Sequence, residues 1–177
     1  LITVLVSVKV HVHVFGRPVI CLVFRDPREG KMWELSEDDL LSIAIGAGIL
    51  GTGGGGNPYI GMLRAREAMR QYGPVTVLSP EELGDDDQVI CVGGIGAPTV
   101  GIEKMRDLQA YYAYQALETY MGKKATALIS NEIGGSNSLE PVMPAAIARL
   151  PIVDADGMGR AFPELQMKTF FAYGVPY

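Results

Sequence analysis

The sequence predicts an α/β fold: a mostly parallel sheet flanked by helices, with glycine-rich loops at the carboxyl ends of the strands. The first observation is the order of the elements. Short apolar strands alternate with helical segments from residue 75 onward, as they do in a parallel sheet. The second is the distribution of the 22 glycines. They gather at 46–56, 93–101, 134–135 and 157–159, and such clustering is typical of tight turns near a ligand.

Composition narrows the class of protein. The chain has 177 residues, which suits one domain, and its 48% hydrophobic and 20% charged residues are typical of a globular protein. A net charge of −5 argues against a nucleic-acid partner, which needs a concentrated basic surface. Lys9 and Arg17 interrupt the apolar residues 1–24, so no membrane span is expected. Cys21 and Cys91 lie in apolar runs and are expected to stay reduced in the cytoplasm.

The first 72 residues begin with strand-like sequence and continue with two helices. Residues 4–15 alternate between apolar and polar side chains, as a half-buried strand does, and 19–24 form a second short strand. Ser36, followed by three acids, begins a mostly buried helix. The glycine-rich segment 46–56 comes next. Residues 57–72 form another helix, because an asparagine cap precedes a proline in its first turn.

The rest of the chain repeats the alternation of strands and helices. The strands are short apolar runs, and turn residues separate them from the helices. In chain order, we expect strands at 75–78 and 87–92, a helix at 103–121, a strand at 125–130, a helix at 138–149, a short strand at 151–153, a polar turn at 154–160 and a helix from Pro163.

Four loops carry the candidate binding residues. Three of them follow predicted strands, and parallel strands bring their carboxyl ends to one edge, where open α/β sheets bind ligands. The fourth precedes the helix at 57–72, where backbone amides and the helix dipole can hold an anion or a carbonyl oxygen. A hinge between two helices is the alternative for this loop. The candidate substrate-binding residues are Thr52, Gly53, Gly54, Gly55, Gly56, Asn57, Gly93, Gly94, Gly96, Thr99, Asn131 and Asn137.

Three acids and one arginine are the candidate catalytic residues. Asp154 and Asp156 can act as a general base or hold a divalent metal, and turn capping explains them equally well. Glu132, at a strand end between apolar residues, is another candidate base, with a structural hydrogen bond to loop amides as the alternative. Arg160 can clamp an anion or make a surface ion pair. The need for a metal and the identity of the base are left open.

Four motifs in one order resemble a known family. They are LGTGGGGNPY at 50–59, VGGIGAPTV at 92–100, NEIGGSNS at 131–138 and DADGMGRAFPELQM at 154–167. Over about 34–169, they resemble the N-terminal domain of the S-methyl thiohydantoin desulfurase family. This domain was formerly one of unknown function associated with hydantoinase/oxoprolinase subunits. Any one motif alone would be weak evidence, and the four together are specific.

The resemblance implies a hydrolase-type enzyme domain that acts on hydantoin-like cyclic amides and removes methanethiol from S-methyl thiohydantoin. Its implied partners are a small cyclic amide substrate and a hydantoinase/oxoprolinase subunit or fused domain, and a homo-oligomer is left open. A non-catalytic ligand-binding or partner subunit is the alternative. A nucleotide-binding module ranks last, because the glycine run matches no nucleotide fingerprint.

The sequence departs from the family at both ends. Residues 1–33 do not resemble its usual start and are expected to be an atypical extension, formed by strands, a linker or a gene-start artefact. Residues 34–177 are expected to form the hydantoinase-associated α/β domain without the C-terminal domain of the family. If the site lies between those two domains, this chain alone will bind its ligand weakly.

Overall fold

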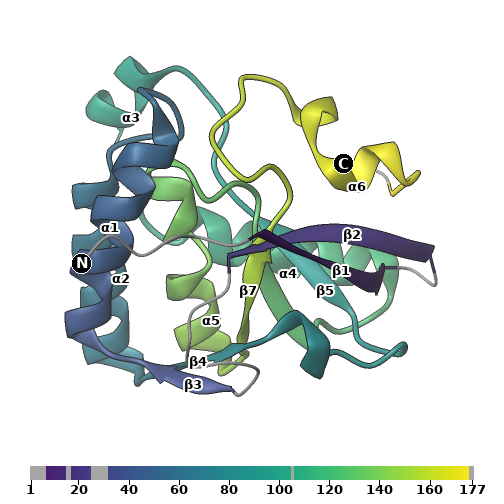
Figure 1. The fold of residues 1–177 in the computed structure, drawn as a ribbon. Coiled ribbons are helices and arrows are strands. Elements are labelled where there is room, and N and C mark those ends of the chain that lie inside the picture. The colour runs from purple at the N-terminus through teal and green to yellow at the C-terminus, as the bar shows by residue number, and fades with distance from the viewer. Residues whose placement is uncertain (1–6, 15–16, 25–31, 105, 176–177) are drawn as a thin grey trace.

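The computed structural model describes residues 7–14, 17–24, 32–104 and 106–175, with the backbone alone for 7–24. Its centre is a sheet of parallel strands in the order β5-β6-β7-β4, and β3 pairs antiparallel with β4 at one edge. The bounds are β3 Trp33–Leu35, β4 Val75–Leu78, β5 Val89–Val92, β6 Ala127–Ser130 and β7 Ile152–Asp156. The prediction of a mostly parallel α/β sheet is therefore confirmed (Figure 1).

An antiparallel hairpin adds to this sheet at the end of β7. Its strands are β1 (Ser7–Val14) and β2 (Arg17–Phe24), and Leu22 of β2 pairs with Asp156. The two strands predicted near the N-terminus are thus confirmed. The faces on which their side chains lie, and the expected turn at 25–31, fall outside the described part of the chain.

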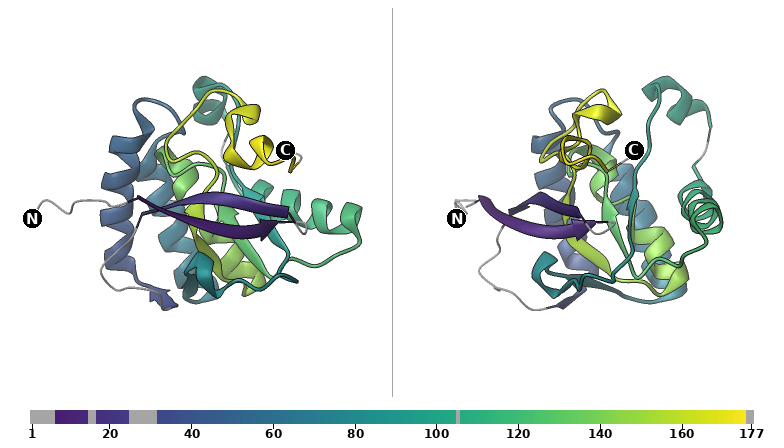
Figure 2. Two further views of the ribbon diagram at one scale, coloured as in Figure 1. Left: turned by 45° about the vertical axis from the view of Figure 1, so that its right-hand side comes forward. Right: turned by 90° about the vertical axis from the view of Figure 1, so that its right-hand side faces the viewer.

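Helices cover the sheet on one face, and the hairpin and the C-terminal segment lie on the other. The right-hand view of Figure 2 shows β1, β2 and α6 on one side and α4 and α5 on the opposite side. The helices are α1 Glu37–Gly51, α2 Pro58–Tyr72, α3 Pro98–Glu103, α4 Gln109–Met121, α5 Val142–Ala148 and α6 Thr169–Ala172, with 3-10 turns η1 Pro80–Glu82, η2 Gly135–Ser138 and η3 Leu165–Met167.

Each face of the sheet has its own core. Leu128 and Ile152 point into the larger cluster, which also contains Leu40 of α1 and Met62 of α2. Ile129 and its neighbours in the sheet point the other way, toward Phe170 of α6. All four residues of β6 are buried, as expected for a strand covered on both faces. None of the helices in the described part of the chain is both long and apolar enough to span a bilayer.

The two N-terminal helices begin where the sequence predicts. Ser36 accepts a hydrogen bond from the Asp39 amide, and the Asp39 carboxylate accepts one from the Ser36 amide, which completes a capping box. Asn57 caps α2 by accepting a hydrogen bond from the Tyr59 amide. The first helix continues to Gly51. The early part of the predicted glycine-rich segment is therefore helical, and only residues 52–56 form the loop.

Several predicted boundaries are wrong. The helix expected at 103–121 begins only at Gln109, as α4, and the short helix α3 at Pro98–Glu103 was not expected. The helix expected at 138–149 begins only after Pro141. Pro141 has no N–H to donate inside a helix, and it lies at the N-cap position of α5. The 3-10 turn η2 precedes it. The polar turn expected at 154–160 begins later, because β7 continues to Asp156. The helix expected from Pro163 is replaced by η3 and α6.

Candidate functional site

The four predicted loops meet at the carboxyl edge of the parallel strands. Gly94 follows β5, and its amide and carbonyl form two hydrogen bonds with the side chain of Asn137, at 2.8 and 2.9 Å. The Asn137 amide in turn donates to the Gly55 carbonyl at 3.1 Å. Ala161, after β7, donates to the carbonyl of Leu50 at 3.3 Å. The edge predicted from the order of the strands is therefore one connected cluster of loops.

Close packing between loops accounts for several of the glycines. A Cβ on Gly55, whose φ is +73°, would lie 2.0 Å from the Gly134 carbonyl oxygen. A Cβ on Gly135, with a φ of +67°, would lie 2.4 Å from the carbonyl carbon of Gly55. Side chains at these two positions would push the loops apart. By contrast, Gly53 has no atom within 4 Å of its Cβ position and is exposed.

Asp156 ends β7 and is almost fully buried, with a relative exposure of 2%. Its Oδ2 accepts hydrogen bonds from the amides of Ile133 at 2.7 Å and Gly159 at 2.8 Å. Burial raises the pKa of Asp156 from 3.8 to about 6, against the backbone hydrogen bonds that lower it, and the charge of Glu132 raises it further. A carboxyl group with a pKa of about 6 is suited to general acid–base catalysis near neutral pH.

Glu132 is buried beside Asp156 and joins two of the loops. Its Oε1 accepts from the Asn137 side chain at 2.7 Å, and its Oε2 accepts from the Phe162 amide at 3.0 Å. The hydroxyl of Ser130 donates to the backbone carbonyls of Glu132 and Asn137. These contacts hold the ends of β6 and β7 together at a fixed spacing. They match the structural alternative considered for Glu132 from the sequence.

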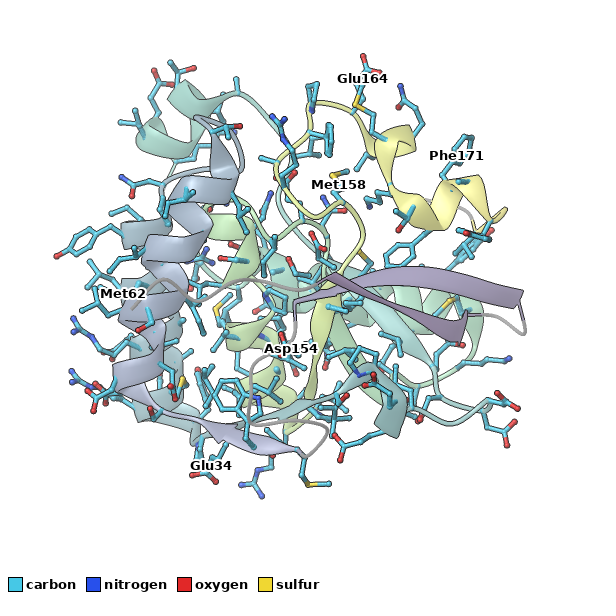
Figure 3. All side chains as sticks on the ribbon, in the orientation of Figure 1. Glu34, Met62, Asp154, Met158, Glu164 and Phe171 are labelled. Atoms are coloured by element: carbon cyan, nitrogen blue, oxygen red, sulfur yellow. The ribbon has the colours of Figure 1, made fainter. Side chains whose placement is uncertain are left out.

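The other predicted acid, Asp154, has a different environment. Between β6 and β7 the register moves from Ile129↔Val153 to Ser130↔Asp156, so β7 has two more residues than β6 over this step. Asp154 is exposed within this bulge, whereas Asp156 is buried. Figure 3 shows Asp154 beside the strand and Met158 in the loop that follows. Among the described residues, no three His, Cys, Asp or Glu side chains are grouped to hold a metal ion, and the metal at Asp154/Asp156 stays a hypothesis.

Arg160 and Thr52 bring exposed polar groups to the same edge. Arg160 Nη2 donates to the Thr52 hydroxyl at 3.0 Å, and its Nε donates to the Ala161 carbonyl at 3.2 Å. The guanidinium also lies 4.9 Å from the centre of the Phe162 ring. This arginine links the loop after β7 to the end of α1.

The remaining predicted residues divide into buried and exposed groups. Asn131 is buried, and its side-chain oxygen lies 3.7 Å from the Cys91 sulfur. Gly93 is in contact with it, since a Cβ there would lie 2.4 Å from Asn131 Cβ. The exposed residues among the predicted substrate-binding ones are Thr52, Gly53, Gly54, Gly56, Asn57, Gly93, Gly96 and Thr99. Burial raises the pKa of the Cys91 thiol to about 11, which keeps it protonated at neutral pH.

Comparison with models of protein families shows which family the chain belongs to. A family model described as S-Me-THD-like, N-terminal domain, matches residues 38–177. The chain belongs to this family. The match contains all four candidate loops, and it confirms the family predicted from the four motifs.

A solved structure agrees with this assignment. An X-ray crystal structure of a protein from Chromobacterium violaceum is 31% identical to the chain, with a TM-score of 0.67. The alignment covers 81% of this chain and 40% of that protein. The chain therefore spans about two fifths of the length of this relative. A comparison with curated proteins finds no match.

One group in this S-Me-THD-like domain was missed by the sequence analysis. Glu140 is buried between α2 and the segment that joins α3 to α4, and it forms ion pairs with Arg64 and Arg106 at 2.8 and 3.6 Å. The three residues are far apart in the sequence and follow no motif. Their association depends on tertiary contacts, so no local pattern could have found it.

Proposed function

We propose that this chain is the N-terminal part of an enzyme that hydrolyses hydantoin-like rings and releases methanethiol from S-methyl thiohydantoin. Membership of the S-Me-THD-like family supports the class of substrate. The observation that carries the catalytic part of the proposal is Asp156, a buried carboxyl group with a pKa of about 6 at the meeting point of the loops. The chain spans about two fifths of its solved relative, so other residues of the active site can belong to the rest of such a protein.

The proposed reaction needs only water as a second reactant. A water oxygen bonds to the ring carbon that carries the methylthio group, and the electrons of the C=N bond move to the nitrogen, which takes up a proton. The carbon–sulfur bond then breaks, and the departing thiolate takes up a proton as methanethiol. The attacking oxygen, having lost its protons, becomes the carbonyl of hydantoin. No oxidant or reductant is involved.

Asp156 is the base that we assign to the attack of water. A carboxylate with a pKa near 6 is mostly ionised at pH 7, and it is a stronger base than an ordinary aspartate. Asp156 is buried, and the Gly159 amide in the loop that follows β7 hydrogen-bonds to its carboxylate. Substrate must therefore displace part of residues 157–159 to reach the carboxyl group. Asp154 stays an alternative base, since it is already exposed.

The other predicted residues support the ring in this scheme. Amides of the loop at 52–56, other than that of Gly54, which donates to the Gly51 carbonyl, stabilise the negative charge that develops on the ring. Glu132 positions the loops through Asn137 and Phe162. Arg160 and Thr52 line the exposed side of the same edge.

Turnover of S-methyl thiohydantoin by the purified chain tests the proposal. Methanethiol is followed with a thiol reagent and hydantoin by chromatography, across pH 4.5 to 8. We expect turnover that rises as pH increases through about 6, and a loss of at least about 100-fold in Asp156→Asn. Asp86→Asn, which removes an exposed carboxylate elsewhere, is the matched control. Turnover that persists in Asp156→Asn with an unchanged pH profile would show that Asp156 is not the base.

A second candidate function is a non-catalytic, ligand-binding domain or partner subunit. It is favoured by the hydrogen bonding of Glu132 and Asp156, whose carboxylates already hold loop amides. Calorimetric titration separates the two candidates. Binding of the ring without turnover, together with copurification of a hydantoinase/oxoprolinase subunit, would support the second.

We also propose that the protein forms a homo-oligomer and that it is cytoplasmic, where the Cys91 thiol stays reduced.

A further inference from the structure

An apolar stripe runs along the outward side of α1. Leu41, Ile45 and Ile49 are spaced by four residues, so they lie in one row on the helix. Their relative exposures are 56%, 59% and 71%, whereas the buried residues of α1 lie toward α2 and η2. Figure 1 shows α1 at the outer left-hand side of the fold. An exposed row of large apolar side chains is typical of a surface that binds another protein.

The start of α2 widens this stripe. Tyr59 and Ile60 are 59% and 50% exposed. They follow Pro58, whose Cγ would lie 3.7 Å from a Cβ on Gly48. The first turn of α2 therefore lies beside the C-terminal half of the stripe. We call the five exposed side chains the α1 face: Leu41, Ile45, Ile49, Tyr59 and Ile60.

The two ends of the α1 face differ in charge. Asp38 and Thr52 lie seven residues before and after Ile45, which is nearly two turns of helix, so both are on the side of Ile45. Asp38 is exposed, and the Thr52 hydroxyl accepts a hydrogen bond from Arg160 Nη2 at 3.0 Å. This bond and the one from Nε to the Ala161 carbonyl use two of the five N–H groups of the guanidinium. The face is therefore acidic at one end and basic at the other.

We propose that the α1 face binds the same face of a second copy of this chain, with the two α1 helices antiparallel. A two-fold axis through Ile45 brings each residue against the one that lies equally far beyond Ile45 in the second copy. Leu41 then packs on Ile49 of the second copy. Ser42 lies opposite Gly48, and these small residues let the two helices approach closely. The inference rests on the proposed homo-oligomer and is independent of the proposed reaction.

Charge complementarity favours a second copy in this orientation. Antiparallel α1 helices place Asp38 of each copy beside Thr52 and Arg160 of the other, so the interface gains two pairs of carboxylate and guanidinium groups. A parallel arrangement would bring like charges together at both ends and weaken association. The second copy also lies against the edge of the candidate site, which Thr52 and Arg160 border.

Sedimentation velocity of the purified chain at about 1 to 100 μM tests this proposal. We expect a dimer, and a dissociation constant at least about 100-fold larger for Ile45→Glu, which places two carboxylates at the centre of the interface. Ile102→Glu makes the same change at an isoleucine of α3 that is 84% exposed and lies outside the α1 face. This control should dimerise like wild type, and circular dichroism shows that both variants are folded.

Two results of this experiment would overturn the proposal in different ways. A monomer over the whole concentration range would remove both the α1 interface and the proposed homo-oligomer. A dimer that Ile45→Glu leaves unchanged would show that the chain associates through another face, so the homo-oligomer would stand and the α1 interface would fail. The ring takes no part in either measurement, so failure of the proposed reaction leaves both results unchanged.

Reversal of single charges tests the antiparallel orientation. Asp38→Arg and Arg160→Glu should each dimerise at least about tenfold more weakly than wild type, because each homodimer then contains two pairs of like charges. An equimolar mixture of the two variants should form a heterodimer with an affinity near that of wild type, since both of its pairs are again opposite in charge. A mixture that associates as weakly as the separate variants would overturn the antiparallel arrangement.

Discussion

At the scale of single residues, Asp156 links the candidate site to stability. Its pKa is about 6 in the folded chain and 3.8 as an ordinary carboxyl group. The folded state therefore holds its proton more tightly than the unfolded state. The stabilising contribution is fully present below pH about 4 and is lost as pH rises through about 6, on the order of 2–3 kcal/mol in all.

Replacement of Asp156 by asparagine removes this titration. The asparagine oxygen can keep the two hydrogen bonds that Oδ2 accepts from Ile133 and Gly159. We therefore expect Asp156→Asn to fold and to gain stability relative to wild type as pH rises from 4.5 to 7.5. Urea denaturation at four pH values in this range measures the difference. A difference that does not change with pH would mean that Asp156 titrates as an ordinary aspartate.

Two glycines of one loop allow the cost of a steric clash to be separated from the cost of backbone strain. Both Gly53 and Gly55 have positive φ, so alanine at either position costs about 1–2 kcal/mol. At Gly55 the new Cβ also meets the Gly134 carbonyl, which adds about 1–3 kcal/mol or prevents folding. We expect Gly55→Ala to be clearly less stable than Gly53→Ala in thermal denaturation. Equal losses would show that the loops at 52–56 and 134–135 are not packed as described.

At the scale of elements, substitutions of Asn57 show whether this loop residue caps the helix α2 or binds the ligand. Its side chain caps α2 through the Tyr59 amide at 3.0 Å. Asn57→Ala should cost about 1 kcal/mol of unfolding free energy, and Asn57→Ser should restore most of it. Gln71→Ala, exposed near the other end of α2, should stay within about 0.5 kcal/mol of wild type in the same denaturation experiment. Loss of ring affinity in the stable Asn57→Ser variant would favour the binding role predicted from the sequence.

Elements with strong local signals were predictable, and those shaped by tertiary contacts were not. The starts of α1 and α2 follow from the caps Ser36 and Asn57, because a cap acts on its own first turn. The break between α3 and α4 has no such signal. There the chain is tied to the distant Glu140 and Arg64 through Arg106 and the Asp107 carbonyl. A local pattern of helix-forming residues cannot report a contact of that kind.

The candidate site, like the elements, was predictable only in part. The strand order alone places the ends of β5, β6 and β7 together, so the sequence could bring Gly94, Glu132 and Asp156 to one edge. The difference between Asp154 and Asp156 could not be read, because a bulge in β7 determines which of the two acids is buried. Alternating faces in a regular strand would have treated the two alike.

At the scale of the whole molecule, the hydrogen bonds between loops predict a shared response to ligand. Gly94 is linked through Asn137 to Glu132, and Glu132 is linked to Phe162. A ligand that orders one loop should therefore slow amide exchange in all of them. Hydrogen exchange with saturating S-methyl thiohydantoin should show slower exchange at 52–57, 93–97, 131–137 and 157–162. The turn at 84–87, closed by its own hydrogen bond, is the internal control.

Ligand binding should raise the unfolding free energy of the chain by an amount that depends on the affinity of the ligand. At about 100 times its dissociation constant, a ligand that binds only the folded chain adds about 2.7 kcal/mol to the unfolding free energy. If the loops act as one unit, Gly55→Ala should reduce this gain and the exchange protection at 157–162 together, because it separates the loop at 52–56 from Gly134. Exchange protection confined to a single loop would show that the hydrogen bonds of Asn137 and Glu132 do not couple the loops to one another. A single rigid cluster of loops would then be the wrong description of the site.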